Sequence, residues 1–131
     1  MTFTSFEGYV ITSIDVERIP GQPKNRVQFH EFIKGDPNDD TACILKNVEY
    51  SGKRVGGKPW GAKIFHATKV KPSELQTQLR AKKRSSNQDP QVLLCVHGLS
   101  VQPETWLADC TRFQEKCKKY WTVIPVIWPG R

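Results

Sequence analysis

The turn His97-Gly98-Leu99-Ser100 combines the residue types in this 131-residue chain that best fit catalysis. It follows the apolar run at 92–96 and precedes a predicted helix, so backbone N–H groups are expected at the mouth of a sheet. Gly98 lets the backbone approach a ligand closely, and the N–H of Leu99 then faces a developing oxyanion. Each well-aimed donor of this kind lowers an acyl-transfer barrier by about 3–4 kcal/mol. The alternative interpretation is an ordinary β-to-α turn with a satisfied histidine, since such turns are frequent.

The elements around this turn read as a βαβ unit. Residues 92–96 form a short continuous apolar run, which is typical of a strand covered on both faces. Pro103 starts a helix that is predicted to reach about Tyr120. Residues 122–127 form a second buried strand, and the order predicts parallel pairing through a helical crossover. The helix carries one apolar stripe, formed by Trp106, Cys110, Phe113 and Cys117.

The chain before this unit is predicted to be rich in β-structure. Strands are expected at 9–16, 26–33, 42–50 and 62–70, with 26–33 at a sheet edge because neither of its sides is cleanly apolar. The last two flank a glycine-rich loop, 51–61, and predict a hairpin with a long tip. Pro72 and Glu74 open a short helix, which ends in a basic run. We therefore divide the chain into a β-rich region with a short basic helix (1–84), a linker (85–90) and the βαβ unit (91–131).

The last 40 residues resemble the α/β-hydrolase superfamily. In that family an apolar strand ends in the His-Gly of the oxyanion loop, a helix with an early tryptophan follows, and the next strand ends near a Pro-Gly. Here these features are the run 92–96 with His97-Gly98, then Trp106, then 123–127 with Trp128-Pro129-Gly130. Many members have an acidic residue in the strand exit, so the Trp128-Pro129 exit is closer to an esterase-like branch. The fold implied is the N-terminal part of an α/β-hydrolase-like sheet, with antiparallel strands followed by the parallel unit.

This resemblance implies a serine-hydrolase scaffold in which His97, Gly98 and Leu99 form part of the oxyanion hole. The chain has no Gly-x-Ser-x-Gly, and the family order places nucleophile, acid and histidine after Arg131. No catalytic residue is therefore assigned within the chain, and His30, His66 and His97 are not candidates for the triad histidine. The alternatives are the N-terminal part of a longer esterase-like or lipase-like acyl hydrolase, acting on a small acyl substrate, or a degenerate product without catalysis. The 131 residues alone are expected to be inactive.

The positive charge predicts a second function of a different class. The chain carries a net charge of +7, and residues 69–84 contain six basic side chains against one acidic. Such a patch attracts anionic partners such as nucleic acid or a charged membrane surface, which makes a non-catalytic binding module the alternative. The ordinary interpretation is a solvated helix end, where cations complement the helix dipole. The six are Lys69, Lys71, Arg80, Lys82, Lys83 and Arg84.

Other chemistry is excluded by composition and spacing. Residues 52–58 fit the Gly-x-x-x-x-Gly-Lys of a phosphate-binding loop, but Pro59 follows where a hydroxyl is required, so no nucleotide cofactor is expected. The four cysteines and three histidines lack metal-ligand spacing, so no metal is expected, and Cys95 is expected to be buried and inert. No apolar run approaches a transmembrane length. Without an export signal, a reducing cytoplasmic location is expected.

Overall fold

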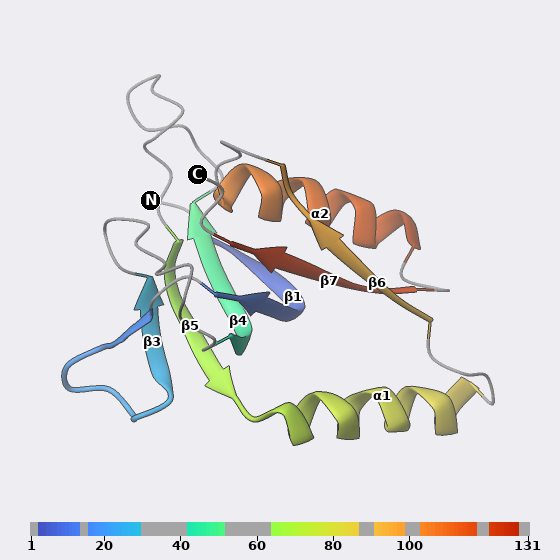
Figure 1. Cartoon of the computed structure of the whole chain (residues 1–131), viewed down its shortest axis with the longest axis horizontal. Coiled ribbons are helices and arrows are strands. Elements are labelled where there is room, and N and C mark those ends of the chain that lie inside the picture. Colours follow the sequence, from blue (N-terminus) through green and yellow to red (C-terminus); the bar gives the residue numbers. More distant parts are fainter. Residues whose placement is uncertain are drawn as a thin grey trace.

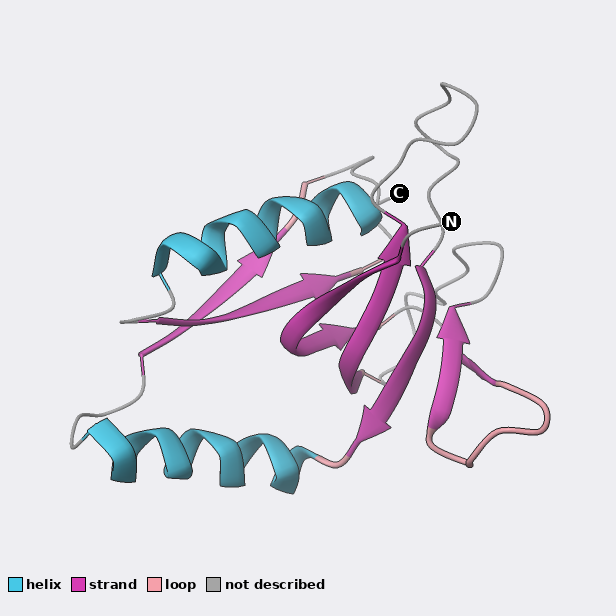
Figure 2. Ribbon diagram, turned by 180° about the vertical axis from the view of Figure 1, so that it is seen from behind, coloured by secondary structure: helices cyan, strands magenta, loops and turns pink. Residues whose placement is uncertain are grey.

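The computed structural model describes residues 3–13, 16–29, 42–51, 64–86, 91–98, 103–117 and 121–128. Within these ranges, seven strands form one mixed sheet in the order β2-β3-β5-β4-β1-β7-β6 (Figure 1). The strands are β1 (Phe3–Thr12), β2 (Val16–Arg18), β3 (Arg26–Phe29), β4 (Cys43–Ser51), β5 (Ile64–Val70), β6 (Gln91–Val96) and β7 (Trp121–Ile127). The helices α1 (Pro72–Ser86) and α2 (Pro103–Cys117) lie on opposite sides of the sheet (Figure 2). The α/β character predicted from the sequence is confirmed.

The antiparallel half of the sheet contains the predicted hairpin. β4 pairs antiparallel with β5, which confirms the pairing of the segments predicted at 42–50 and 62–70. The strand predicted at 9–16 is two elements, because β1 already begins at Phe3 and ends at Thr12, and β2 begins at Val16. The edge position predicted for 26–33 is wrong for β3, since β2 pairs on one side of it and β5 on the other. Residues 30–33 and the tip at 52–61 lie outside the described residues.

An irregularity in β1 anchors helix α2. The pairing of β1 with β4 shifts between Phe6 and Tyr9. Gly8 lies in this interval with a φ of +129°, which L side chains rarely adopt. The amide of Gln114, on α2, donates from Nε2 to the Glu7 carbonyl oxygen at 2.9 Å. The carbonyl that the bulge exposes is therefore satisfied by the helix packed above it.

The βαβ unit completes the sheet. β6 and β7 are parallel and in register from Gln91↔Trp121 to Val96↔Val126, with α2 between them in sequence. β7 also pairs in parallel with β1, so the regions 1–84 and 91–131 share one sheet. Ser85 and Ser86, predicted to begin a linker, still belong to α1. The sheet therefore continues across the predicted division of the chain.

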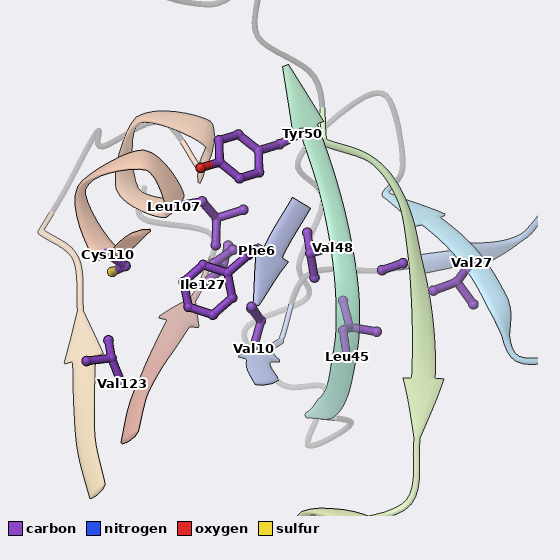
Figure 3. Close-up of a cluster of buried hydrophobic side chains, with 11 residues drawn as sticks. Phe6, Val10, Val27, Leu45, Val48, Tyr50, Leu107, Cys110, Val123 and Ile127 are labelled. Carbon is purple, nitrogen blue, oxygen red and sulfur yellow. The ribbon is translucent and has the colours of Figure 1, made fainter. Parts of the chain in front are cut away.

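The main core lies between the sheet and α2 (Figure 3). Phe6 from β1 and Leu107 from α2 are 1% and 0% exposed, and they meet near the centre of this core. Complete burial of one such side chain contributes about 1.5–3 kcal/mol relative to its exposed state. The other buried members labelled in the figure are Val10, Val27, Leu45, Val48, Tyr50, Cys110, Val123 and Ile127.

The apolar stripe predicted for α2 is only partly the face that enters this core. Cys110 is buried, but Phe113 is 43% exposed. Leu107, which the predicted stripe omits, is completely buried. Thr111 on the same side donates its hydroxyl to the Leu107 carbonyl and lies 2.9 Å from the Tyr50 hydroxyl of β4. The helix is therefore rotated relative to the prediction: its buried face lies over β7 and β1, and Thr111 reaches Tyr50 of β4.

The prediction that 92–96 is covered on both faces is wrong. In the part of the chain that the structure describes, β6 is the border strand and pairs with β7 alone. Val92, Leu94 and Val96 are 37%, 55% and 59% exposed. By contrast, β7 is central and its residues 122–125 are buried, as predicted. Both strands have the same apolar pattern. An apolar run therefore does not show by itself whether other elements cover the strand on both faces.

Helix α1 is attached to the other side of the sheet by polar contacts. Glu74 accepts hydrogen bonds from the Tyr9 hydroxyl at 3.3 Å and from Lys46 Nζ at 3.0 Å. Burial first, and then the Glu74 carboxylate, raise the pKa of Tyr9 above its usual value. Near the other end of α1, Lys82 Nζ donates to the Thr122 hydroxyl of β7 at 2.7 Å. These contacts place the helix across β4, β1 and β7, beginning at Pro72 as the sequence predicts.

Candidate functional site

The candidate turn lies at the carboxyl end of β6. His97 and Gly98 follow the last strand residue, Val96, and are described, whereas Leu99 lies outside the described residues. Because Val96 is in register with Val126 of the parallel neighbour, the turn lies beside the exit of β7. The residue brought next to it is Trp128.

The buried ring of His97 connects the backbone that follows β6 with the backbone that follows β7. The side chain is 4% exposed. Its Nδ1 lies 2.8 Å from the Gly98 carbonyl oxygen, and the backbone N–H of Trp128 donates to Nε2 at 3.2 Å. A carbonyl oxygen only accepts and an N–H only donates, so the proton of a neutral ring is assigned to Nδ1. Both ring nitrogens are therefore occupied by backbone groups.

Two tryptophans enclose the same histidine. Trp128 stacks on the ring, with centroids 5.3 Å apart and planes 7° apart, and Trp106 meets it edge-on at 6.1 Å. Each indole N–H also donates a hydrogen bond to a backbone carbonyl oxygen. Trp128 Nε1 donates to the His97 carbonyl at 2.9 Å, and Trp106 Nε1 donates to the Cys95 carbonyl at 3.1 Å. We call His97, Trp106 and Trp128 the aromatic clamp. It fixes the backbone from Cys95 to Gly98, so His97 is a positioning residue.

Gly98 leaves open space at the turn. A Cβ placed on this residue meets no heavy atom of the described residues within 4 Å, and its φ lies outside the left-handed region. The residue is exposed. The glycine is therefore not required by crowding from the described residues or by a left-handed backbone. Close approach of a ligand at Gly98 stays a prediction.

Trp128 is the residue of this site that the sequence analysis leaves without a role. Its position in the sequence predicts the exit of the second strand and no contact with His97. The predicted parallel order contained the signal, because residues that follow neighbouring parallel strands lie at the same edge of the sheet. His97 and Trp128 satisfy this condition, and the structure brings them into contact.

An apolar hollow opens beside the clamp, between α2 and β6. Its volume is about 290 Å³, and Asp109 is the charged residue among its lining residues. The hollow exists because α2 turns its buried face toward β1 and β7 and leaves Phe113 and part of Trp106 over the border strand. The lining residues are Leu93, Cys95, Trp106, Asp109, Cys110 and Phe113.

The cysteines of this hollow differ in exposure. Cys95 is half-buried, which corrects the prediction that it is buried, and the reason is the border position of β6. Cys110 is 2% exposed. Burial and the neighbouring Cys95 raise the pKa of the Cys110 thiol to about 12. Burial also raises the pKa of Cys95, although a hydrogen bond with Cys110 acts in the opposite direction.

The basic segment is only partly a free surface. Lys69, Lys71 and Arg80 are exposed. Lys82 is exposed as well, but its Nζ donates a hydrogen bond to the Thr122 hydroxyl. For Lys83 and Arg84 the described part of the chain includes the helical backbone only. The structure therefore places three of the six predicted cations in solvent without bringing them to the turn at His97.

Metal, nucleotide and membrane sites were expected to be absent. Among the described residues, no group of three or more histidine, cysteine or acidic side chains is placed to hold a metal ion. The glycine-rich segment 52–58 lies outside them. No helix in the described ranges is both long and apolar enough to cross a bilayer.

No protein-family model, curated protein or solved structure matches this chain.

Proposed function

We propose that this chain is the N-terminal part of a serine-hydrolase-like acyl hydrolase and supplies half of its oxyanion hole. The observation that carries the proposal is the aromatic clamp, which fixes the backbone of the turn after β6 while Gly98 stays open to a ligand. An oxyanion hole needs donors held rigidly before charge develops. A turn held through His97, Trp106 and Trp128 meets this requirement.

The chemistry assigned to the turn is electrostatic. In acyl transfer to an ester, amide or related small acyl compound, the carbonyl oxygen becomes an oxyanion, and the Leu99 N–H is the donor that this chain offers. In the resembled family, the second donor is the N–H of the residue after the nucleophile. His97 is not the general base, because backbone groups occupy both of its ring nitrogens. Nucleophile, base and acid are therefore assigned to residues outside this chain.

The exposed border strand supports the proposal that the nucleophile, base and acid lie outside this chain. Parallel strands are normally covered on both faces, and the aliphatic side chains of β6 are instead exposed on the α1 side. Among the described residues, the outer edge of β6 has no partner strand, and it offers the place for one further parallel strand. In the resembled family, the nucleophile follows such a strand.

Activity-based labelling tests this function. A fluorophosphonate probe is expected to leave the 131-residue chain unlabelled and to label the product of the complete reading frame that contains it. Peptide mapping is expected to place the label on a serine after residue 131. Specific labelling of the 131-residue chain would contradict the proposed placement of the nucleophile. A reading frame without a nucleophile elbow in the next βα unit would exclude catalysis.

A cytoplasmic location belongs to the same proposal. All four cysteines are free in the structure, which supports a reducing compartment.

The exposed cations of the basic segment favour a second candidate, a binding module for anionic partners. Lys71 and Arg80 are both exposed on or beside α1. Binding to RNA or to anionic vesicles is expected to weaken as salt rises, and to weaken further in a Lys71→Gln/Arg80→Gln variant. The matched control is Lys24→Gln/Lys116→Gln, which removes two exposed cations elsewhere. An affinity that does not change between low and high salt would exclude this candidate.

A further inference from the structure

Two thiols from different elements meet in the hollow between β6 and α2. Cys95 comes from the border strand and Cys110 from the helix, and both line the hollow. Their side chains are close enough for each thiol to shift the pKa of the other. The pair forms beside the aromatic clamp, because the carbonyl of Cys95 accepts the indole N–H of Trp106.

The two thiols are unequally accessible. Cys95 is half-buried and faces a hollow that opens at the border of the sheet, whereas Cys110 is 2% exposed beneath α2. A dissolved reagent therefore reaches the sulfur of Cys95 first. Cys110 lies behind it in the same hollow, where it can attack the adduct that forms on Cys95.

The interaction between the two thiols also makes them chemically unequal. Burial raises the pKa of both, but the hydrogen bond lowers the pKa of Cys95 and raises that of Cys110 further, to about 12. Cys95 is thus the first of the two to ionise. Nucleophilic attack on a disulfide proceeds through the thiolate, so the order of ionisation agrees with the order of access.

We propose that Cys95 and Cys110 are an exchange-active thiol pair that low-molecular-weight disulfides oxidise to a disulfide joining β6 to α2. In the first step the Cys95 thiolate attacks one sulfur of oxidised glutathione, whose S–S bond breaks. One glutathione leaves as a thiolate, and the other remains on Cys95 as a mixed disulfide. In the second step Cys110 loses its proton to solvent and attacks the Cys95 sulfur, and the second glutathione leaves. The two protein thiols lose two electrons, and oxidised glutathione becomes two reduced molecules.

The border position of β6 makes the closure feasible. A disulfide needs the two sulfurs at about 2.05 Å, closer than hydrogen-bonded thiols lie. Within the described ranges, β6 is paired with a strand on one side only, so it can approach α2 without breaking a second ladder there. The resulting bridge joins the strand to the helix two residues before His97. Oxidation of the pair would therefore act on the base of the candidate turn.

The test uses the folded 131-residue chain exposed to oxidised glutathione, followed by blocking of free thiols and peptide mapping. Wild type is expected to become lighter by two hydrogens and to yield one disulfide-linked peptide pair, Cys95 with Cys110, which dithiothreitol reverses. Cys110→Ala is expected to stop at the mixed disulfide on Cys95, and Cys95→Ala to leave Cys110 unmodified. Cys117→Ala is the matched control on the same helix and is expected to react as wild type does.

The wild-type map decides the proposal even if a variant unfolds, and circular dichroism of each variant identifies such a case. A folded wild type that forms no Cys95–Cys110 bridge would overturn the proposal. A mixture of pairings that includes Cys43 and Cys117, equal to the mixture obtained in urea, would overturn it as well.

Discussion

Replacement of His97 by alanine should destabilise the chain strongly, because its ring is the centre of the aromatic clamp. The ring is 4% exposed and stacks on Trp128. Loss of an aromatic pair costs about 1 kcal/mol. The Trp128 N–H, which now donates to Nε2, would lose its acceptor at a further cost of about 1–3 kcal/mol. The space left by the ring adds to this, so we expect a total of about 3–4 kcal/mol, within the usual range for a buried ring replaced by alanine.

Two variants separate the contributions to this value. His97→Phe keeps the ring stack but removes both nitrogens, so we expect a loss of about 2 kcal/mol from the unpaired Trp128 N–H and the unpaired Gly98 carbonyl. Val96→Ala is the matched control, one residue earlier in a side chain that is 59% exposed, and is expected to change stability by less than about 0.5 kcal/mol.

Urea unfolding followed by far-ultraviolet circular dichroism measures these differences, and the linear extrapolation gives the free energy of unfolding. Tryptophan fluorescence adds a local probe, since Trp106 and Trp128 both contact His97. If His97→Ala lost no more stability than Val96→Ala, the ring would not hold the turn. The proposal of a rigid oxyanion donor would then lose its support.

Three further predictions concern the same half of the molecule. Gly98→Ala should change the free energy of unfolding by less than about 0.5 kcal/mol. Gly8→Ala, at a φ of +129°, should lower it by about 1–3 kcal/mol. Equal losses would contradict the assigned backbone conformations. Leu107→Ala should cost about 2–5 kcal/mol and Leu94→Ala less than about 1 kcal/mol in urea unfolding, and the reverse order would contradict the rotation of α2 and the border position of β6. The free energy of unfolding should fall as pH rises from about 9 toward 12, because the raised pKa of Cys110 means that folding favours its protonated form; an equally steep fall in Cys110→Ala would refute this cause.

Local signals predicted the elements better than their order in the sheet. Pro72 and Glu74 gave the start of α1, and the apolar runs gave β6 and β7. Whether such a run has one neighbour or two depends on strands elsewhere in the chain. For this reason the same reasoning was correct for Val123 and wrong for Leu94.

Side-chain spacing also left the orientation of α2 undetermined. Trp106, Cys110 and Phe113 form a regular stripe, but Leu107 lies next to this stripe and is the residue that the sheet buries. Spacing alone cannot choose between two adjacent apolar faces, since the choice depends on which strands lie beneath the helix.

For the candidate site, the sequence identified the turn but not what holds it. His97 and Gly98 lie at the predicted carboxyl end of a strand, and the space at Gly98 is open. The contact of His97 with Trp128 joins positions 31 residues apart in the chain and depends on the register of two parallel strands. Leu99 lies outside the described residues, and its role as an oxyanion donor stays a prediction.

The hydrolase proposal depends above all on the backbone N–H of Leu99. The decisive measurement is the rate constant of fluorophosphonate labelling for the product of the complete reading frame, as wild type, Leu99→Pro and Leu99→Ala. Proline removes the N–H and alanine keeps it, so we predict a loss of about 10²–10³-fold for Leu99→Pro and a small change for Leu99→Ala. Equal rates for the proline and alanine variants, or no labelled serine in the wild type, would contradict the proposal.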